Sequence, residues 1–384
     1  MKRVGIFSLG ALCLMCSCSR AAVQPDSADS TARIEELASG PAQATLLFVG
    51  DAMQHQAQLD RARELGGGDS WDYTGYFTLL EPEIKGADYA IVNLETPLGG
   101  GKGGYTGFPC FSAPDEFAVA LKDAGFDLFL TANNHTLDRG DYGLRRTLST
   151  LDSLKVDHIG TYRDKAEREK LVPFVREVNG IRIGFLNYSY GTNGIAARDG
   201  AEVSLIDKET MAREMKKARE AGAELLVVMP HWGVEYVLNE NAQQRDLARY
   251  LIDQGADLII GSHPHVVQPM RVVRSDRYDK DVLVVYSLGN FVSNMKTGDT
   301  RGGAMVTVVV ERDAQGDAHF SSAAYDTFYA AKPDGSARSN FRVIPSWHAS
   351  EIPVSQRGWW NTFDSSARRL FSRENVNVPA AEHK

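Results

Sequence analysis

The sequence predicts an α/β protein in which buried strands alternate with amphipathic helices. Short apolar runs without clear alternation are typical of strands that are buried on both faces. Helical patterns lie between these runs, and several carry Asp or Asn near the start and Gly just after the end. This order favours βαβ units with largely parallel pairing, and in such sheets ligands bind beyond the carboxyl ends of the strands.

The predicted strands share a run of Leu, Val, Ile or Phe followed by polar residues. They cover residues 45–51, 89–95, 127–135, 225–233 and 257–265. The predicted helices cover residues 114–126, 142–155, 207–222 and 241–255. Further along, residues 303–311 and 318–329 predict two more strands in a hairpin, and residues 356–375 predict one amphipathic helix. The residue pattern alone therefore reaches an α/β fold with a mixed sheet.

Length and composition are those of an ordinary globular protein. The chain has 384 residues, of which 43% are hydrophobic and 24% charged, enough to bury a core without disulfide support. The net charge of −8 and the lack of a Lys/Arg stripe with interleaved aromatic residues argue against nucleic acid as a partner. Cys110 is the one cysteine outside the N-terminal segment, so we expect no disulfide framework and a buried or half-buried thiol.

Residues 1–18 predict an export signal. MKR is a basic start, and the apolar run VGIFSLGALCLM is too short to span a bilayer. Ser17 is the small residue expected before the lipidated cysteine of a bacterial lipoprotein, here Cys18; an uncleaved anchor or an ordinary signal peptide is the alternative. Residues 19–43, rich in Ala, Ser, Asp, Gln and Pro, predict a flexible tether. We therefore expect an exported protein, lipid-anchored in the cell envelope at the outer or the cytoplasmic membrane.

Polar side chains follow each of the five predicted strands. They are Asp51, Glu95, Asn133, Asn134, His135, His231, His263 and His265. Carboxylates, a carboxamide oxygen and imidazoles suit divalent metals such as Mn, Fe, Zn or Mg. A single residue of this kind is more often structural, but their occurrence at five strand ends predicts a metal site. Pro264 cannot extend a helix or a ladder, so it fixes a loop that presents both flanking histidines.

Longer motifs carry a resemblance to a known family. They are VGDAM, VNLETPL, FPCFSAP, LTANNHTLDRGDYGLRRTL, IGTYR, LNYSYGTNG, PHWGVEY, GADLIIGSHPHVVQP and YSLGNFV. In this order they resemble the CapA family, named for poly-γ-glutamate capsule synthesis, within the calcineurin-like metallophosphoesterases. The resemblance implies a four-layer α/β/β/α sandwich with two mixed β-sheets. We expect this domain at 44–330, with 331–384 as an extension that packs on it.

The resemblance also implies a role for each strand-end residue. The implied metal ligands are Asp51, Glu95, Asn134, His231, His263 and His265. Among them Glu95 matches the acid that bridges two metals. His135, which is not one of these ligands, matches the general acid. One or two divalent ions are therefore expected.

The chain departs from the superfamily pattern at three points. The usual first motif is Asp-x-His, whereas His55 lies four residues after Asp51, so its role as a ligand is open. Glu95 stands where the superfamily has Asp, which would alter the metal spacing. The Asn-His pair lacks the acid that usually follows it, and Asp138 either orients His135 or forms a turn.

Residues around these motifs are expected to contact the substrate. They are His55, Asn93, Asn133, Tyr190, Trp232, Glu235 and Asn290. Tyr190 and Trp232 either offer aromatic faces to a sugar or peptide-like polymer or belong to the core. Glu235 either meets the substrate or orients an imidazole as a partner of His231.

Two functions from different classes follow. The first is a metal-dependent hydrolase that uses a metal-activated water on a phosphoester or an anionic polymer, in capsule or exopolymer synthesis. The second is a non-catalytic envelope scaffold, or a polymer-binding component that works with a membrane synthase. The ligand set and His135 favour the enzyme, because a scaffold has no physical need for them. Membrane tethering favours the scaffold, because polymer assembly needs organisers.

Overall fold

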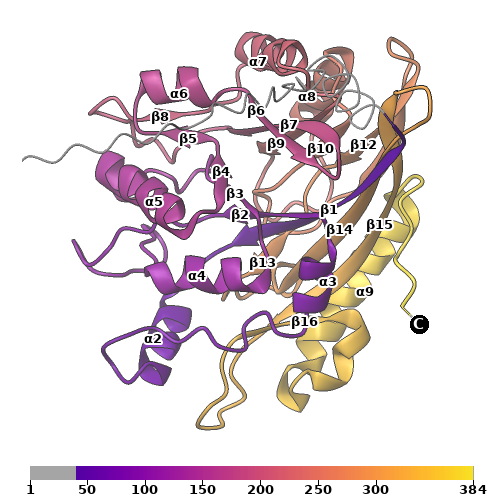
Figure 1. Ribbon diagram of the computed structural model, residues 1–384. Helices are drawn as coiled ribbons and strands as arrows, with labels where there is room; N and C mark the ends of the chain where they lie inside the picture. The colour runs from indigo at the N-terminus through magenta and orange to yellow at the C-terminus, as the bar shows by residue number, and fades with distance from the viewer. Residues whose placement is uncertain (1–39, 384) are drawn as a thin grey trace, which may run out of the picture. The chain divides into compact units, whose positions relative to one another are not determined.

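Two β-sheets lie face to face in residues 40–383, the part of the chain that the computed structural model describes (Figure 1). The larger sheet has eight strands in this part, ordered β16-β15-β14-β1-β2-β3-β4 with β13 beside β1. Its strands are β1 (Ala42–Ala52), β2 (Tyr89–Leu94), β3 (Leu128–Leu130), β4 (Asp157–Ile159), β13 (Asn290–Val292), β14 (Gly302–Arg312), β15 (Ala318–Ala331) and β16 (Arg342–Pro345). Strands β1 to β4 and β13 pair in parallel, whereas β14, β15 and β16 pair antiparallel.

The smaller sheet has six strands in the described residues, ordered β11-β12-β10-β9-β7-β6. They are β6 (Phe174–Val178), β7 (Ile181–Ser189), β9 (Leu225–His231), β10 (Leu258–Ile260), β11 (Met270–Ser275) and β12 (Lys280–Val285). The four central strands are parallel, and an antiparallel strand closes each edge. Both sheets are therefore mixed.

Helices cover the outer face of each sheet. On the larger sheet they are α2 (Gln56–Leu65), α3 (Glu81–Gly86), α4 (Asp115–Ala124) and α5 (Gly140–Leu154). On the smaller sheet they are α7 (Lys208–Glu220) and α8 (Ala242–Asp253). A short helix, α6 (Lys165–Leu171), contacts the small ladder of β5 (Thr161–Tyr162) and β8 (Glu202–Val203). The predicted four-layer α/β/β/α sandwich with two mixed sheets is confirmed.

Strand β1 shows why the apolar runs of the predicted strands do not alternate apolar with polar residues. Its Ala44, Leu46 and Phe48 face the smaller sheet, while Leu47 and Val49 face the helices. Successive side chains of a strand point to opposite faces, so a strand between two layers needs apolar residues at every position. The same holds for β9, all of whose residues are buried.

The helices begin and end at the signals that the sequence carries. Asp207 caps α7 by accepting a hydrogen bond from Thr210 N at 2.9 Å. Asn241 caps α8 by accepting from Gln244 N at 2.8 Å, in a capping box. Gly125 ends α4 in the left-handed region with φ +113°, which a residue without a side chain adopts at low cost.

The predicted end of the tether at residue 43, the predicted end of the domain at residue 330 and the predicted burial of Cys110 need correction. Ala42 and Gln43, placed in the tether, pair with β14, because the first strand begins earlier than its apolar run. The larger sheet continues past residue 330: β15 runs to Ala331 and β16 pairs with it. The thiol of Cys110 is exposed, because it lies on a surface loop. The predicted signal peptide with Cys18, and residues 19–39 of the predicted tether, lie outside the described residues.

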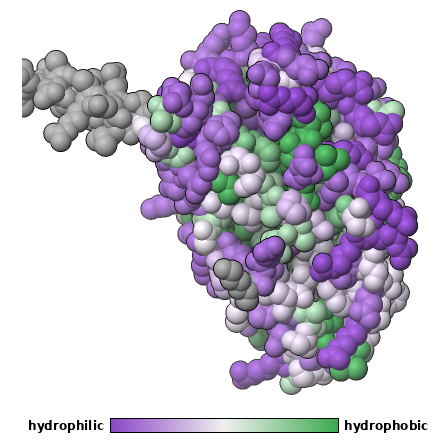
Figure 2. Space-filling model, turned by 90° about the vertical axis from the view of Figure 1, so that its right-hand side faces the viewer, coloured by the Kyte–Doolittle hydropathy of each residue, from purple (hydrophilic) through white to green (hydrophobic). Residues whose placement is uncertain are grey.

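The C-terminal segment holds the two sheets together at one side. Three short 3₁₀ turns occur at Gly298–Thr300, Ser346–Glu351 and Val354–Gln356, and α9 (Arg357–Glu374) follows the last of them. Helix α9 contacts β15 of the larger sheet and β11 of the smaller one. On the side of the molecule where α9 and β15 lie, hydrophilic residues surround smaller apolar areas (Figure 2). Over residues 40–383, no helix has the length and apolar character that crossing a membrane requires.

Truncation of Phe185 between the sheets should destabilise the fold. Phe185 on β7 is 1% exposed, and its ring centroid lies 5.3 Å from that of Tyr89 on β2 of the opposite sheet. We expect Phe185→Ala to lower the free energy of unfolding by about 3–5 kcal/mol, measured by urea denaturation. The control Val354→Ala, at a side chain 77% exposed, should stay within about 0.5 kcal/mol of the parent. Equal effects of the two substitutions would contradict the packing described.

Candidate metal centre

Strand ends from both sheets meet at one edge of the sandwich. The larger sheet contributes Asp51 at the end of β1, Glu95 after β2 and Asn134 after β3; the smaller sheet contributes His231 at the end of β9, and His263 and His265 after β10. All six residues are buried. The structure therefore brings the whole predicted ligand set together, from two sheets instead of one.

Among the described residues, three groups of acidic and histidine side chains at this edge each place their ligand atoms within 4.8 Å of one another. One group is Asp51, Glu95 and His265, and a second is Glu95, His231 and His263. Glu95 Oε1 lies 3.8 Å from His265 Nε2 and 3.6 Å from His231 Nε2. Glu95 therefore belongs to two of the groups and lies between their histidines.

Two further residues extend the cluster. Asn134 Oδ1 lies 2.7 Å from His231 Nε2, so both atoms face the same point. Glu235 forms the third group with His263 and His265, and its side chain is exposed. Glu235 therefore approaches two ligand histidines from the open side of the site.

Glu95 is a buried carboxylate without hydrogen-bond partners. It is 0% exposed, and neither of its oxygens accepts a hydrogen bond from any described residue. Burial raises the pKa of Glu95 well above its usual range, and the negative charge of Asp51 raises it further. A buried polar group without a partner costs about 1–3 kcal/mol, and more when it is charged. A bound cation would offset that cost, so these residues fit a divalent metal.

The pKa values of three other candidate ligands also favour metal binding. Burial lowers the pKa of His231 well below its usual range and that of His263 to about 3. Burial acts to raise the pKa of Asp51, but the hydrogen bond with His265 and the nearby histidine charges lower it to about 2. Metal ligands must be deprotonated, so the neutral imidazoles of His231 and His263 and an ionised Asp51 match that need.

Side chains behind the ligands fix their orientation. Asn93 Nδ2 donates to Asp51 Oδ1 at 2.7 Å, and Asn290 Oδ1 lies 3.0 Å from His265 Nδ1. Ser262 Oγ lies 2.8 Å from His231 Nδ1. A partner on the outer nitrogen of a ligating histidine fixes both its ring and its tautomer.

Three asparagines expected at the substrate are thus placed elsewhere. Asn93, Asn133 and Asn290 are at most 1% exposed. Asn133 Nδ2 donates to Leu94 O at 2.9 Å, and its Oδ1 accepts from His135 N at 3.1 Å. Because protein groups satisfy these amides, they support the ligands and do not face the pocket.

The loop after β10 holds both of its histidines in a strained backbone. His263 has φ +98° and His265 has φ +58°, in the left-handed region that favours glycine. Such a conformation costs about 1–3 kcal/mol for each residue. Tyr236 N donates to Pro264 O at 2.8 Å, and His263 N donates to Asp51 Oδ2 at 3.3 Å. These contacts hold the loop so that both imidazoles face the cluster.

Glycines before two of the ligands permit a close backbone approach. A Cβ on Gly50 would lie 1.9 Å from Gly289 O, and one on Gly261 would lie 2.2 Å from Tyr286 O. Neither distance is physically possible for carbon and oxygen atoms. The absent side chains therefore let the strands come close enough to assemble the site.

His135 forms a dyad with Asp138 beside the metal ligands. His135 Nδ1 lies 2.8 Å from Asp138 Oδ2, which also accepts a hydrogen bond from Phe111 N at 2.7 Å. The ring of Phe111 packs edge-on against His135 at 4.6 Å between centroids. Asp138 N also donates to His135 O at 3.0 Å. Asp138 thus does both things that the sequence left open: it orients His135 and closes a turn.

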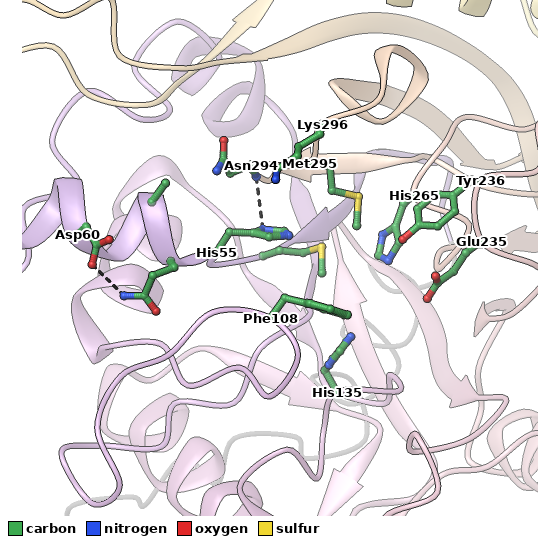
Figure 3. Close-up of a pocket in the computed structure, with 13 residues that line it drawn as sticks. His55, Asp60, Phe108, His135, Glu235, Tyr236, His265, Asn294, Met295 and Lys296 are labelled. Carbon is green, nitrogen blue, oxygen red and sulfur yellow. Dashed lines mark hydrogen bonds between the residues drawn. The ribbon is translucent and has the colours of Figure 1, made fainter.

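A pocket of about 610 Å³ opens in front of the cluster (Figure 3). His55, His135, Glu235, Tyr236 and His265 line it. His55 belongs to none of the three metal groups; its Nδ1 accepts a hydrogen bond from Asn294 N at 3.3 Å, and burial lowers its pKa to about 4. His55 is therefore part of the pocket wall.

The two aromatic residues expected at the substrate have different environments. Tyr190 is 48% exposed, and its ring centroid lies 4.5 Å from that of His263, so it stands at the open side of the cluster. Trp232 is 3% exposed, packs in the core of the smaller sheet and donates from Nε1 to Tyr286 O at 2.9 Å. Trp232 therefore does not reach the cluster; it borders a second pocket of about 590 Å³.

Sequence reasoning missed Asn193. Its Oδ1 accepts from Asn134 Nδ2 at 3.2 Å, and its Nδ2 lies 3.5 Å from His135 Nδ1. Asp141 anchors the rest of this loop by accepting hydrogen bonds from the backbone of residues 198, 199 and 201. The Asn-Gly pair at 193–194 signals a turn but gives no sign that the turn reaches the site.

The fold and the site define an α/β sandwich with a candidate divalent metal centre at its strand ends. The sequence model of the family described as "Bacterial capsule synthesis protein PGA_cap" matches residues 45–295. The chain therefore belongs to this family of bacterial capsule synthesis proteins.

Two relatives support the same assignment by their sequences. The chain is 31% identical over 280 residues to the PGA biosynthesis protein CapA of Bacillus subtilis (strain 168), covering 70% of this chain and 68% of that protein. It is 30% identical over 271 residues to the capsule biosynthesis protein CapA of Bacillus anthracis, covering 68% and 62%. The match thus spans about two thirds of each relative.

A calcineurin-like phosphoesterase of known structure, YfkN from Bacillus subtilis, aligns with a TM-score of 0.45 at 13% identity, over 87% of this chain and 99% of that one.

Replacement of Glu95 should remove the stabilisation that metal gives. We expect Mn²⁺ added to the metal-free protein to raise the Tm, since a ligand that binds only the folded state stabilises it. Glu95→Gln should abolish most of that rise, because the amide carries no charge between the two groups. Glu220→Gln, at an exposed position of α7, is the control and should keep it. A full metal-dependent Tm shift in Glu95→Gln, followed by differential scanning calorimetry, would contradict the site.

Proposed function

We propose that this chain is a metal-dependent hydrolase of the cell envelope that uses activated water to cleave a phosphoester or another bond of an anionic polymer. The observation that carries the proposal is Glu95: a fully buried carboxylate with no hydrogen-bond partner in the described residues, between two histidine-containing groups. A purely structural site has no reason to keep such a charge, because its burial destabilises the fold. Membership of the capsule synthesis family supports the setting.

The residues that would hold the metal are the six strand-end ligands, with Glu235 next to them on the exposed side. A divalent ion held there would supply Lewis-acid chemistry, that is, a lower pKa for water next to it and neutralisation of negative charge on the substrate. Metal identity stays open among Mn, Fe, Zn and Mg, since oxygen and imidazole ligands suit all four.

His135 is placed to move a proton. Its Nδ1 side is occupied by Asp138, and its ring points into the pocket (Figure 3). With Asp138 fixing the tautomer, Nε2 is the atom that can donate a proton to a leaving oxygen. Phe111 packs against the ring and excludes water from one side of it. His135 is therefore the general acid of the proposed reaction.

A non-catalytic scaffold is the second candidate. The names of the relatives refer to biosynthesis, and one relative, 25% identical over 236 residues, is named a probable polyglutamine synthesis accessory protein of Mycobacterium tuberculosis. An organiser of polymer synthesis would use the pocket for binding alone. The two candidates differ in whether the metal centre turns over a substrate.

The cellular setting is part of the proposal. We infer export through the N-terminal signal and attachment through a lipid on Cys18, in the outer or cytoplasmic membrane. The partners proposed are an anionic polymer or phosphoester substrate and, for the second candidate, a membrane synthase. Nucleic acid is not among them, given the net charge of −8.

Elemental analysis and an activity assay test the hydrolase together. The purified full-length chain should carry one or two metal ions and, with added Mn²⁺, hydrolyse bis-p-nitrophenyl phosphate. The double variant His263→Ala, His265→Ala should lose both metal and activity, because it removes ligands from all three groups. Metal without turnover on this or any polymeric substrate would leave the scaffold as the better account.

Loss of the Asp138 carboxylate should separate proton transfer from metal binding. We expect Asp138→Asn to lower kcat by about 10²–10⁴-fold, because His135 loses the partner that fixes its tautomer. Metal content by elemental analysis should stay at the level of the parent, since Asp138 belongs to no metal group. A decrease in metal content equal to that in activity would show instead that the substitution disrupts the whole site.

A further inference from the structure

The pocket in front of the metal ligands has an apolar wall. Met53, Ala57, Phe108, Tyr236 and Met295 supply it. Phe108 and Tyr236 extend into the pocket from two sides (Figure 3). Phe108 is 72% exposed and Tyr236 is 55% exposed. A single exposed apolar side chain is ordinary on a protein surface, but two large ones that line the same pocket indicate a surface for a ligand.

Phe108 is held in its exposed position by an anchored loop. Thr106 and Ser112 exchange backbone hydrogen bonds of 3.1 and 2.9 Å on either side of it. Gly107 N donates to Gln56 Oε1 at 3.3 Å, and a Cβ on Gly107 would lie 2.3 Å from Gln56 N. The loop therefore lies directly against the start of α2, and it presents the phenyl ring at the pocket.

Tyr236 is fixed by its backbone on the other side of the pocket. It has φ +67°, which is rare and costly for a bulky residue. Tyr236 N donates to Pro264 O at 2.8 Å, so this conformation is tied to the loop that carries two of the candidate metal ligands. The ring centroid of Tyr236 lies 6.1 Å from that of His265. The phenol ring is therefore held beside the metal ligands while much of its surface stays exposed.

The position of Phe108 indicates which part of a substrate it would contact. Its ring packs against Phe111 at 6.4 Å between centroids, and Phe111 packs against His135 at 4.6 Å. Phe108 thus lies on the side of His135, the residue that gives a proton to the leaving oxygen in the proposed reaction. A group in contact with Phe108 is therefore part of the leaving group, because the reacting group lies at the metal ligands.

The chemistry of the wall favours an uncharged aromatic ring. Phenyl and phenol rings make favourable edge-on or offset contacts with another ring. The thioethers of Met53 and Met295 also contact aromatic rings favourably. Of the three charged side chains among the described residues that line the pocket, two are the acids Asp60 and Glu235, and the third is Lys296. An anionic group therefore gains little from this wall, because it meets more negative than positive charge.

We propose that Phe108 and Tyr236, together with Met53 and Met295, form a subsite for an uncharged aromatic ring in the leaving group of a phosphoester. The inference rests on the proposed function for the reaction, and it narrows the substrate to esters of an alcohol that carries a nucleobase or an aryl group. On hydrolysis the P–O bond to that alcohol breaks and the oxygen of water takes its place on phosphorus. His135 supplies the proton that the departing oxygen needs, while the subsite holds the ring.

Binding of a neutral aromatic compound to the full-length chain tests the subsite without using activity. The probe is 4-methylumbelliferyl β-glucoside, followed by fluorescence anisotropy. Phe108→Ala should weaken its binding about tenfold, because one ring contact is lost. Tyr236→Asn should have a similar effect, and Asn tolerates the left-handed backbone at this position. Tyr278→Ala, at a ring that is 43% exposed and lies outside the pocket, is the matched control and should bind like the parent.

Two competitors of similar size separate ring chemistry from general apolar contact. Phenyl β-glucoside should displace the probe, and its saturated counterpart, cyclohexyl β-glucoside, should do so about fivefold less well. Adenosine in the same assay distinguishes the two sources of the ring, since it should displace the probe better than phenyl β-glucoside if the subsite takes a nucleobase. Equal displacement by the two glucosides would overturn the aromatic assignment. Unchanged probe binding in both Phe108→Ala and Tyr236→Asn would overturn the subsite itself.

Glu95→Gln separates this inference from the hydrolase. Glu95 does not line the pocket, so the variant should keep probe binding while it loses metal. A chain that binds the probe through Phe108 and Tyr236 but never hydrolyses a phosphoester retains the subsite and loses the hydrolase. A chain that hydrolyses bis-p-nitrophenyl phosphate, yet binds the probe equally well with and without the Phe108 ring, retains the hydrolase and loses the subsite.

Discussion

The apolar contact between the two β-sheets is the constraint on which the rest of the structure depends. Residues such as Phe48 and Phe185 fill the space between the sheets, and the relative position of the sheets follows from that packing. Once the sheets are fixed, the ends of β1, β2 and β3 lie opposite the ends of β9 and β10. The candidate metal centre lies at that junction, because its candidate ligands come from both sheets.

The same junction concentrates features that destabilise a folded chain. Glu95 is buried without a hydrogen-bond partner among the described residues, and His263 and His265 hold left-handed backbone conformations. Both costs are borne by the packing around them and would be reduced by a bound cation. The features that suit this edge of the sheets to metal binding therefore lower the stability of the fold, as is common at sites that hold charge.

Much of the architecture could be predicted, and the reasons are physical. Strands buried on both faces give continuous apolar runs, and capped helices carry Asp207 or Asn241 at their starts. The ligand set could be named because carboxylates and imidazoles are costly to bury at successive strand ends unless a metal binds them. Neighbours of the ligands were harder to assign: Asn93, Asn133 and Asn290 have the composition of substrate contacts but face inward. Trp232 and Tyr190 are both aromatic residues next to candidate site motifs. Only their burial in the structure shows that Trp232 belongs to the core and that Tyr190 is accessible.

By itself the sequence determined the alternation of elements, the family and the residue types of the candidate site. These depend on periodicity and on local chemistry, which neighbours along the chain are enough to set. The tertiary structure alone decided that the ligands come from two sheets, that Asp138 holds His135, and that Asn193 reaches the site from a distant loop. Such relations join residues far apart in the chain, and their distances follow from how whole layers pack, which no local pattern records.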